Sequence, residues 1–243
     1  MRKYYTRPCN FYYGNYAKKL ISKKKAFPLA GNKNIAFDQL EIFQRKGKKV
    51  VQSKFYPVNK INRLDKKKLI AIKRDLKNII STRKKLFNFE FRDPKIMGIL
   101  NVTPDSFSDG GLFLNKQKAF NQANLMLKNG ASIIDIGGES TRPGSVTINE
   151  KVEWKRIKSI IIKLKKKFPK TTLSLDSRKS YVIKKGIENK INLINDVSGL
   201  NFDKNTFNVI NSNKIPFILH HMQGTPNTMQ KNPKYNDVLL DIF

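Results

Sequence analysis

The second part of the chain alternates short apolar runs with helical stretches, and this alternation constrains the fold more than any other feature. The apolar runs lie at residues 96–102, 132–137, 172–176, 192–196 and 216–220. Stretches with helical spacing lie at residues 116–129, 149–168, 179–189 and 203–212. Apolar strands that alternate with helices are typical of βα units built around a parallel sheet. About five such units are predicted.

Polar residues follow each of these predicted strands. They are Asn101, the segment from Asp135 to Thr141, Asp176, the pair Asn195-Asp196, and the pair His221-Met222. The carboxyl ends of successive parallel strands meet on one face, which is where the active sites of (β/α)8 barrels lie. The sequence therefore predicts an α/β fold: a partial TIM (β/α)8 barrel behind a small basic α+β extension.

The boundary between these two parts is expected at Asp93-Pro94, because a residue before proline is driven out of the helical conformation. Residues 1–94 are predicted to form the extension, with a hairpin over 40–56 turning at Lys46-Gly47 and a helix over 65–87. Residues 95–243 are predicted to form the barrel domain.

The chain has a net charge of +31, and two thirds of the excess lies before Ile96. Lysine-rich runs recur on predicted solvated helix faces and in loops, which favours a general compositional bias over a dedicated nucleic-acid groove. No apolar run reaches the roughly 18 to 20 residues of a membrane span, and the amino terminus lacks an apolar leader. A cytoplasmic protein without a membrane partner is expected. The single Cys9 has no internal disulfide partner.

Five segments carry a specific family resemblance. Asn101–Gly111 and Gly130–Gly144 closely resemble the two main signature segments of the dihydropteroate synthases. Three shorter segments, Leu173–Ser177, Ile194–Ser198 and His221–Gln230, match later strand ends in the same order and spacing. The resemblance implies a transferase of folate biosynthesis. Its substrates would be 4-aminobenzoate and 6-hydroxymethyl-7,8-dihydropterin diphosphate, and its products 7,8-dihydropteroate and diphosphate.

The resemblance also implies site residues at the strand ends. Asp176 and Asn195 would bind the pterin ring, whose alternating donors and acceptors need fixed carboxylate and amide partners. Asn101 would help to hold Mg²⁺ and the leaving diphosphate. Met222 would line the pocket. His221 matches the pocket-side histidine of the family, while His220 is expected to be a packing variation.

Two loops would close over the substrates. By resemblance, Asp109 and Arg142 are the catalytic candidates, forming an ion pair that bridges the loops. Thr141 would contact the diphosphate side of the pterin. Phe107 and Pro143 would shape the slot for 4-aminobenzoate.

The resemblance covers five of the eight βα units of the family. Its sixth to eighth strand segments, with a substrate-flanking lysine and a phosphate-gripping Arg/His pair, have no counterpart before Phe243. The chain is therefore expected to be truncated, to bind pterin weakly or not at all, and not to turn over alone; the full-length form is expected to be a homodimer. Two alternatives remain open: another pterin-binding barrel, such as a folate-dependent methyltransferase, and a basic nucleic-acid-binding protein.

Overall fold

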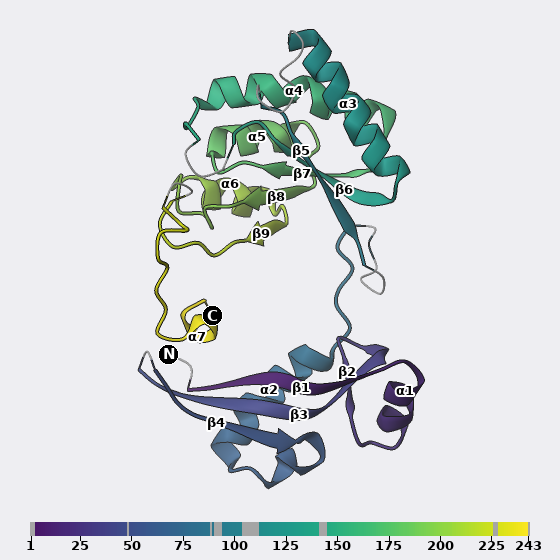
Figure 1. Ribbon diagram of the computed structural model, residues 1–243, viewed down its shortest axis with the longest axis vertical. Coiled ribbons are helices and arrows are strands. Elements are labelled where there is room, and N and C mark those ends of the chain that lie inside the picture. The colour runs from purple at the N-terminus through teal and green to yellow at the C-terminus, as the bar shows by residue number, and fades with distance from the viewer. Residues whose placement is uncertain are drawn as a thin grey trace. The chain divides into compact units, whose positions relative to one another are not determined.

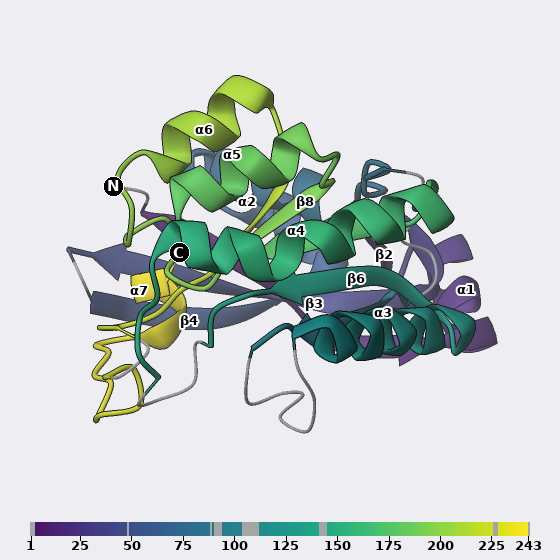
Figure 2. The ribbon, with the colours of Figure 1, turned by 90° about the horizontal axis from the view of Figure 1, so that it is seen from above.

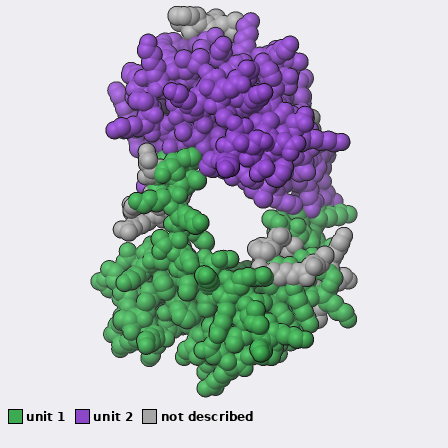
Figure 3. Space-filling view, turned by 180° about the vertical axis from the view of Figure 1, so that it is seen from behind, with its two compact units in different colours: residues 1–92, 234–243 green, residues 93–233 purple. Residues whose placement is uncertain are grey.

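The computed structural model describes residues 3–47, 49–87, 89, 94–103, 112–140, 145–225 and 228–242. It divides into two compact units, coloured separately in Figure 3. One unit comprises residues 1–92 and 234–243, and the other comprises residues 93–233. Among the described residues, no helix is long and apolar enough to cross a membrane.

The first unit is built on a four-stranded antiparallel sheet (Figure 1). Its strands are β1 (Tyr4–Tyr13), β2 (Phe27–Leu29), β3 (Asn32–Lys46) and β4 (Lys49–Pro57). The long strand β3 pairs with each of the other three. Its helical elements are α1 (Gly14–Ser22), the 3₁₀ helix η1 (Val58–Arg63), α2 (Lys66–Ile80) and α7 (Val238–Ile242).

The expected hairpin is confirmed by the pairing of β3 with β4, and Gly47 turns with a φ of 62°. The expected helix is shorter than predicted. Helix α2 starts after Asp65, whose side chain accepts from the Lys68 N–H, and it ends at Ile80 instead of residue 87. The helix ends because the Ser81 backbone is extended, and the Ser81 hydroxyl donates to the Lys77 carbonyl of the last turn at 2.5 Å. Strand β1 and helix α1 add to the predicted hairpin and helix.

The second unit contains a five-stranded sheet in which the strands follow their order in the chain. The strands are β5 (Ile96–Asn101), β6 (Ala131–Gly137), β7 (Thr172–Asp176), β8 (Leu193–Asp196) and β9 (Phe217–Leu219). Every neighbouring pair is parallel. Chain-order parallel pairing is the arrangement of a (β/α) barrel, whereas a doubly wound sheet reverses its strand order. The predicted fold class is confirmed.

Four helices connect these strands: α3 (Leu112–Lys128), α4 (Glu150–Lys167), α5 (Ser180–Glu188) and α6 (Thr206–Asn213). They contact one another in succession, and Figure 2 shows α4, α5 and α6 side by side. Helix α4 begins at Asn149, whose side chain accepts from the Lys151 N–H at 2.8 Å. Acidic residues in its first turn and lysines in its last turn complement the helix dipole.

One row of register partners faces the helices and forms the core of this unit. It runs through Leu100, Ile136, Leu175 and Ile194, and all four side chains are buried. Because side chains alternate along a strand, the next row must face the opposite side of the sheet. That next row holds the polar strand ends.

Candidate functional site

The site is a row of residues across the carboxyl ends of four strands. Asn101, Gly137, Asp176 and Asn195 are register partners on β5, β6, β7 and β8. Since register partners in a parallel sheet point to the same side, the three polar side chains share one face. The structure therefore brings together three of the residues that the sequence singled out.

Gly137 gives the row its space. A Cβ atom there would lie 3.2 Å from Asp176 Oδ2 and 3.6 Å from Asn101 Oδ1. The two side chains thus lean over the glycine from either side. A larger residue at this position would displace at least one of them.

Asp176 is the most perturbed acid of the described site. Burial is the largest cause, and together with the charges of neighbouring carboxylates, Asp135 first among them, it raises the pKa of Asp176 to about 7. Like charges and low dielectric both disfavour the ionised form. A carboxyl group poised near neutrality can gain or lose a proton when a ligand binds.

Below this row lies Asp135, which is buried on β6. Its Oδ2 accepts from Asn195 Nδ2 at 2.8 Å. Burial raises the pKa of Asp135, while the Asn195 amide opposes that rise. The sequence marked Asp135 only as part of a polar strand end. Its contact with Asn195 depends on which residues face each other across the sheet.

His220 also reaches the row. Its Nε2 lies 2.6 Å from Asn195 Oδ1, and its side chain is half-buried. The expectation that His220 is only a packing variation is corrected by this contact. The pair His220-His221 follows β9, which ends at Leu219, so alternation along a strand could not assign the inward side chain.

A buried ion cluster holds the start of the loop after β6. The Lys179 ammonium lies 2.8 Å from Glu139 Oε1 and 2.6 Å from Glu153 Oε2. Arg178 Nε donates to Glu139 Oε2 at 3.0 Å. Glu139 also accepts the Ile148 N–H at 3.0 Å, which ties the far end of the loop to its beginning.

This cluster has an effect on the protonation of its acids. Burial would raise the pKa of Glu139, but the Arg178 and Lys179 side chains hold it below its usual value. For Glu153, burial dominates and raises the pKa, although Lys179 opposes the rise. Neither the cluster nor its role in holding the loop was foreseen from the sequence.

Five predicted site residues lie outside the described part of the chain: Phe107, Asp109, Thr141, Arg142 and Pro143. Met222 is described and is half-buried, shortly after the end of β9.

The described side chains limit the kind of metal site that this chain could form. Among the described residues, no group of three His, Cys, Asp or Glu side chains could hold a metal ion. Asn101 offers one exposed amide group at the end of β5. Mg²⁺ keeps several waters and takes one or two protein ligands beside substrate phosphates. A single amide oxygen fits a magnesium ion held chiefly by a diphosphate, and does not fit a metal held by protein alone.

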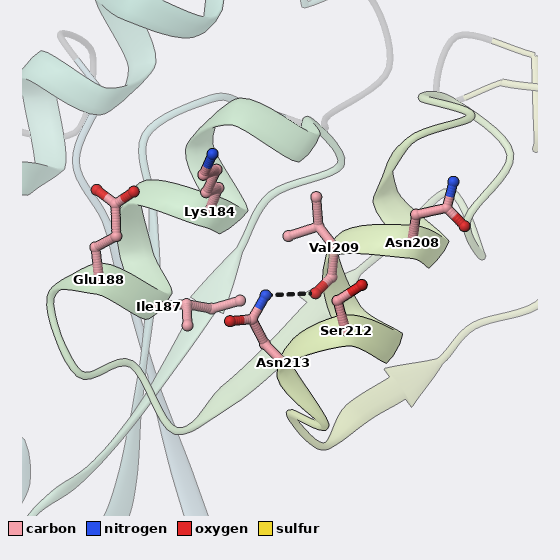
Figure 4. A pocket seen from close by; sticks show the side chains of 7 residues that line it. All are labelled: Lys184, Ile187, Glu188, Asn208, Val209, Ser212 and Asn213. Atoms are coloured by element: carbon pink, nitrogen blue, oxygen red, sulfur yellow. Dashed lines mark hydrogen bonds between the residues drawn. The ribbon is translucent and has the colours of Figure 1, made fainter.

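A separate pocket lies between α5 and α6, with a volume of about 420 Å³ (Figure 4). Its lining includes Lys184, Glu188 and Asn213, and Asn213 donates to the Val209 carbonyl at 2.8 Å. The pocket is lined by helical residues alone, and none of them belongs to the strand-end row. It therefore forms no part of the candidate site.

A chain-order parallel sheet with carboxylate and amide groups gathered at its strand ends defines a (β/α)-barrel protein with a polar ligand site. The family model described as "Pterin binding enzyme" matches residues 97–242. The chain belongs to the pterin-binding enzyme family.

Curated relatives and solved structures agree with this family. Dihydropteroate synthase from Haemophilus influenzae is 42% identical over 150 residues, which cover 62% of this chain and 54% of the relative. A crystal structure of the Clostridium difficile dihydropteroate synthase with pteroic acid is 39% identical, with a TM-score of 0.57, covering 62% of this chain and 55% of that one. The crystal structure of the Yersinia pestis dihydropteroate synthase with a sulfonamide drug is 40% identical, with a TM-score of 0.58, and covers 65% of this chain and 58% of that one. The chain spans about half the length of the curated relatives it matches.

Proposed function

We propose that this chain carries the pterin-binding wall of a cytoplasmic dihydropteroate synthase. The enzyme would join 4-aminobenzoate to 6-hydroxymethyl-7,8-dihydropterin diphosphate in folate biosynthesis and release diphosphate. The observation that carries the proposal is the row of Asn101, Asp176 and Asn195 on one face of the sheet. The likeness to relatives named dihydropteroate synthase supports it.

The pterin would be bound by Asp176 and Asn195. An ionised Asp176 accepts hydrogen bonds from ring amino and N–H groups, and charge-assisted bonds of this kind are the stronger ones. Because the pKa of Asp176 is raised to about 7, a ligand that donates to it would draw the carboxyl group into its ionised form. Asn195 can donate and accept at the same time.

The reacting end of the substrate would lie toward Asn101. A bound magnesium ion would neutralise charge on the leaving diphosphate, and Asn101 would be its protein ligand. We assign Asp109 and Arg142 to loop closure, Thr141 to the diphosphate side, Phe107 and Pro143 to the aminobenzoate slot, and Met222 to the pocket wall. These assignments rest on the family resemblance of their segments.

Calorimetric titration of the full chain with 6-hydroxymethyl-7,8-dihydropterin tests the proposal. Asp176→Asn should weaken binding about ten- to a hundredfold, because it removes a charged acceptor. Asn208→Ala, an exposed change on α6, serves as the control and should bind like the unmodified chain. Equal affinity of the Asp176→Asn variant and the unmodified chain would contradict the proposal.

A further inference from the structure

The side-chain amide of Asn195 is held at both ends by residues from two other strand ends. Its Nδ2 donates to Asp135 Oδ2 at 2.8 Å, and its Oδ1 lies 2.6 Å from His220 Nε2. Asp135 comes from β6, Asn195 from β8, and His220 follows β9. The family resemblance of the sequence included no role for a histidine at this position.

The chemistry of the three groups fixes their orientation. The amino group of Asn195 faces Asp135 and donates to its Oδ2, and this carboxyl oxygen accepts the bond. The carbonyl oxygen then faces His220, and since this oxygen can only accept, His220 must carry a proton on Nε2. The amide cannot rotate by half a turn without placing its oxygen against the carboxylate.

This arrangement leaves Asn195 with a defined remaining capacity. One N–H of Nδ2 and one lone pair of Oδ1 are unused by the two contacts. Because Asp135 of β6 holds the Nδ2 end and His220 after β9 holds the Oδ1 end, the order of donor and acceptor along the amide is fixed. A planar heterocycle matches this pattern when its acceptor faces Nδ2 and its neighbouring donor faces Oδ1. A ring edge with the two groups exchanged does not match.

We propose that His220 is a positioning residue that fixes the donor-acceptor order which Asn195 presents to the pterin edge. The proposal rests on the proposed function for the identity of the ligand. It concerns a residue that acts through Asn195, so it requires no contact between His220 and the ligand.

The backbone around His220 is built for this placement. Gly199, in the loop after β8, has a φ of 60°, and a Cβ atom there would lie 2.5 Å from the His220 carbonyl oxygen. Only a glycine permits this close approach. The β8 loop and the end of β9 are thereby held together, which brings the imidazole to the amide of the neighbouring strand.

Three variants of the full chain distinguish a positioning role of His220 from a packing role, because their side chains differ in whether they can donate a hydrogen bond to Asn195. His220→Gln keeps an N–H donor and should bind 6-hydroxymethyl-7,8-dihydropterin within about threefold of the unmodified chain. His220→Leu loses the donor and should bind about three- to tenfold more weakly. His220→Glu sets a second acceptor against the amide and should bind more weakly than His220→Leu.

The order of the three affinities shows whether His220 positions Asn195 or only fills space. A packing role would rank the variants by shape, so Leu would match or exceed Gln, and that result would overturn the proposal. Equal affinities of the Glu and Gln variants would overturn it as well. Thermal melts of each variant show whether it is folded before its affinity is compared.

A measurement without ligand keeps the proposal separate from the proposed function. Nitrogen-15 NMR of the histidine side chains should show a proton on His220 Nε2, with His221→Gln used to assign the two rings. Loss of the His220 contact in His220→Leu should shift the Asn195 side-chain amide signals. If the unmodified chain binds no pterin, the proposed binding wall is not sufficient for binding on its own, and the NMR signals still decide the orientation of the Asn195 amide. An Nε2 without a proton would overturn the proposal.

Discussion

Asp176 combines a half-buried position with a requirement for charge. Burial and nearby carboxylates raise its pKa from the ordinary value of 3.8 to about 7. The folded state therefore holds a proton that the unfolded state releases at lower pH. This linkage favours folding at low pH, and its contribution is lost as the pH rises through 7.

Asp176→Asn should remove this loss of folding stability at high pH, because the amide does not titrate. The variant should gain more stability against urea at pH 8 than at pH 5, while losing pterin affinity. Asp203→Asn provides a comparison of opposite sign. Burial alone would raise the pKa of Asp203, but the Ser180 side chain and the Asn205 and Ser180 N–H groups lower it overall, so this variant should lose stability at pH 8. An Asp176→Asn gain that is equal at both pH values would contradict the linkage.

Some of the site could be predicted at this scale, and some could not. Asn101, Asp176 and Asn195 are polar residues at the ends of apolar runs, so their convergence follows from the alternation of strands and helices. The contacts of Asp135 and His220 with Asn195 depend on register and on backbone bends after a strand. A single sequence does not encode these directly.

At the scale of elements, Lys179 joins three parts of the second unit. Its ammonium contacts Glu139 at the end of β6 and Glu153 on α4, and Lys179 itself stands at the start of α5. All three side chains are buried. Removing one member of a buried ion cluster leaves the others uncompensated, which costs about 3 to 5 kcal/mol.

Lys179→Met should therefore reduce the free energy of unfolding by about 3 to 5 kcal/mol in urea melts. Lys185→Met is a matched control on α5, since its partner Glu188 is exposed and such surface pairs contribute about 0 to 1 kcal/mol. Similar losses in the two variants would show that the cluster contributes no more than a surface pair. Loss of the cluster should also release the loop after β6, seen as faster amide exchange at Ile148.

The elements themselves were largely predictable. All five predicted strands and four predicted helices of the second unit occur within a few residues of their expected bounds. The predicted end of α2 at residue 87 was wrong, because the backbone is extended at Ser81, where the hydroxyl satisfies the Lys77 carbonyl of the last turn.

At the scale of the whole molecule, the parallel sheet has two edges among the described strands, β5 and β9. Each edge exposes a large apolar side chain: Ile96 is 59% exposed and Leu219 is 70% exposed. Unpaired apolar strands are templates for pairing with other chains.

The double variant Ile96→Lys and Leu219→Lys should reduce concentration-dependent self-association, because charged edge residues discourage strand pairing. Analytical ultracentrifugation over a range of concentrations would measure the effect. Val152→Lys, on the surface of α4, adds a charge at another 45% exposed apolar position and serves as the control. If the control suppresses association equally, net charge and not the edges is responsible.

The chain-order sheet also bears on how this protein acquires its structure during synthesis. Each strand of the second unit after β5 pairs with the strand made immediately before it. A newly made βα unit therefore finds its partner already in place, and ordering can proceed in the direction of translation. In the first unit, β1 has to wait for β3 across the intervening α1 and β2. We expect the ribosome-bound chain to gain the parallel sheet one βα unit at a time. The antiparallel sheet should instead form in a single step, some time after its first strand has been made.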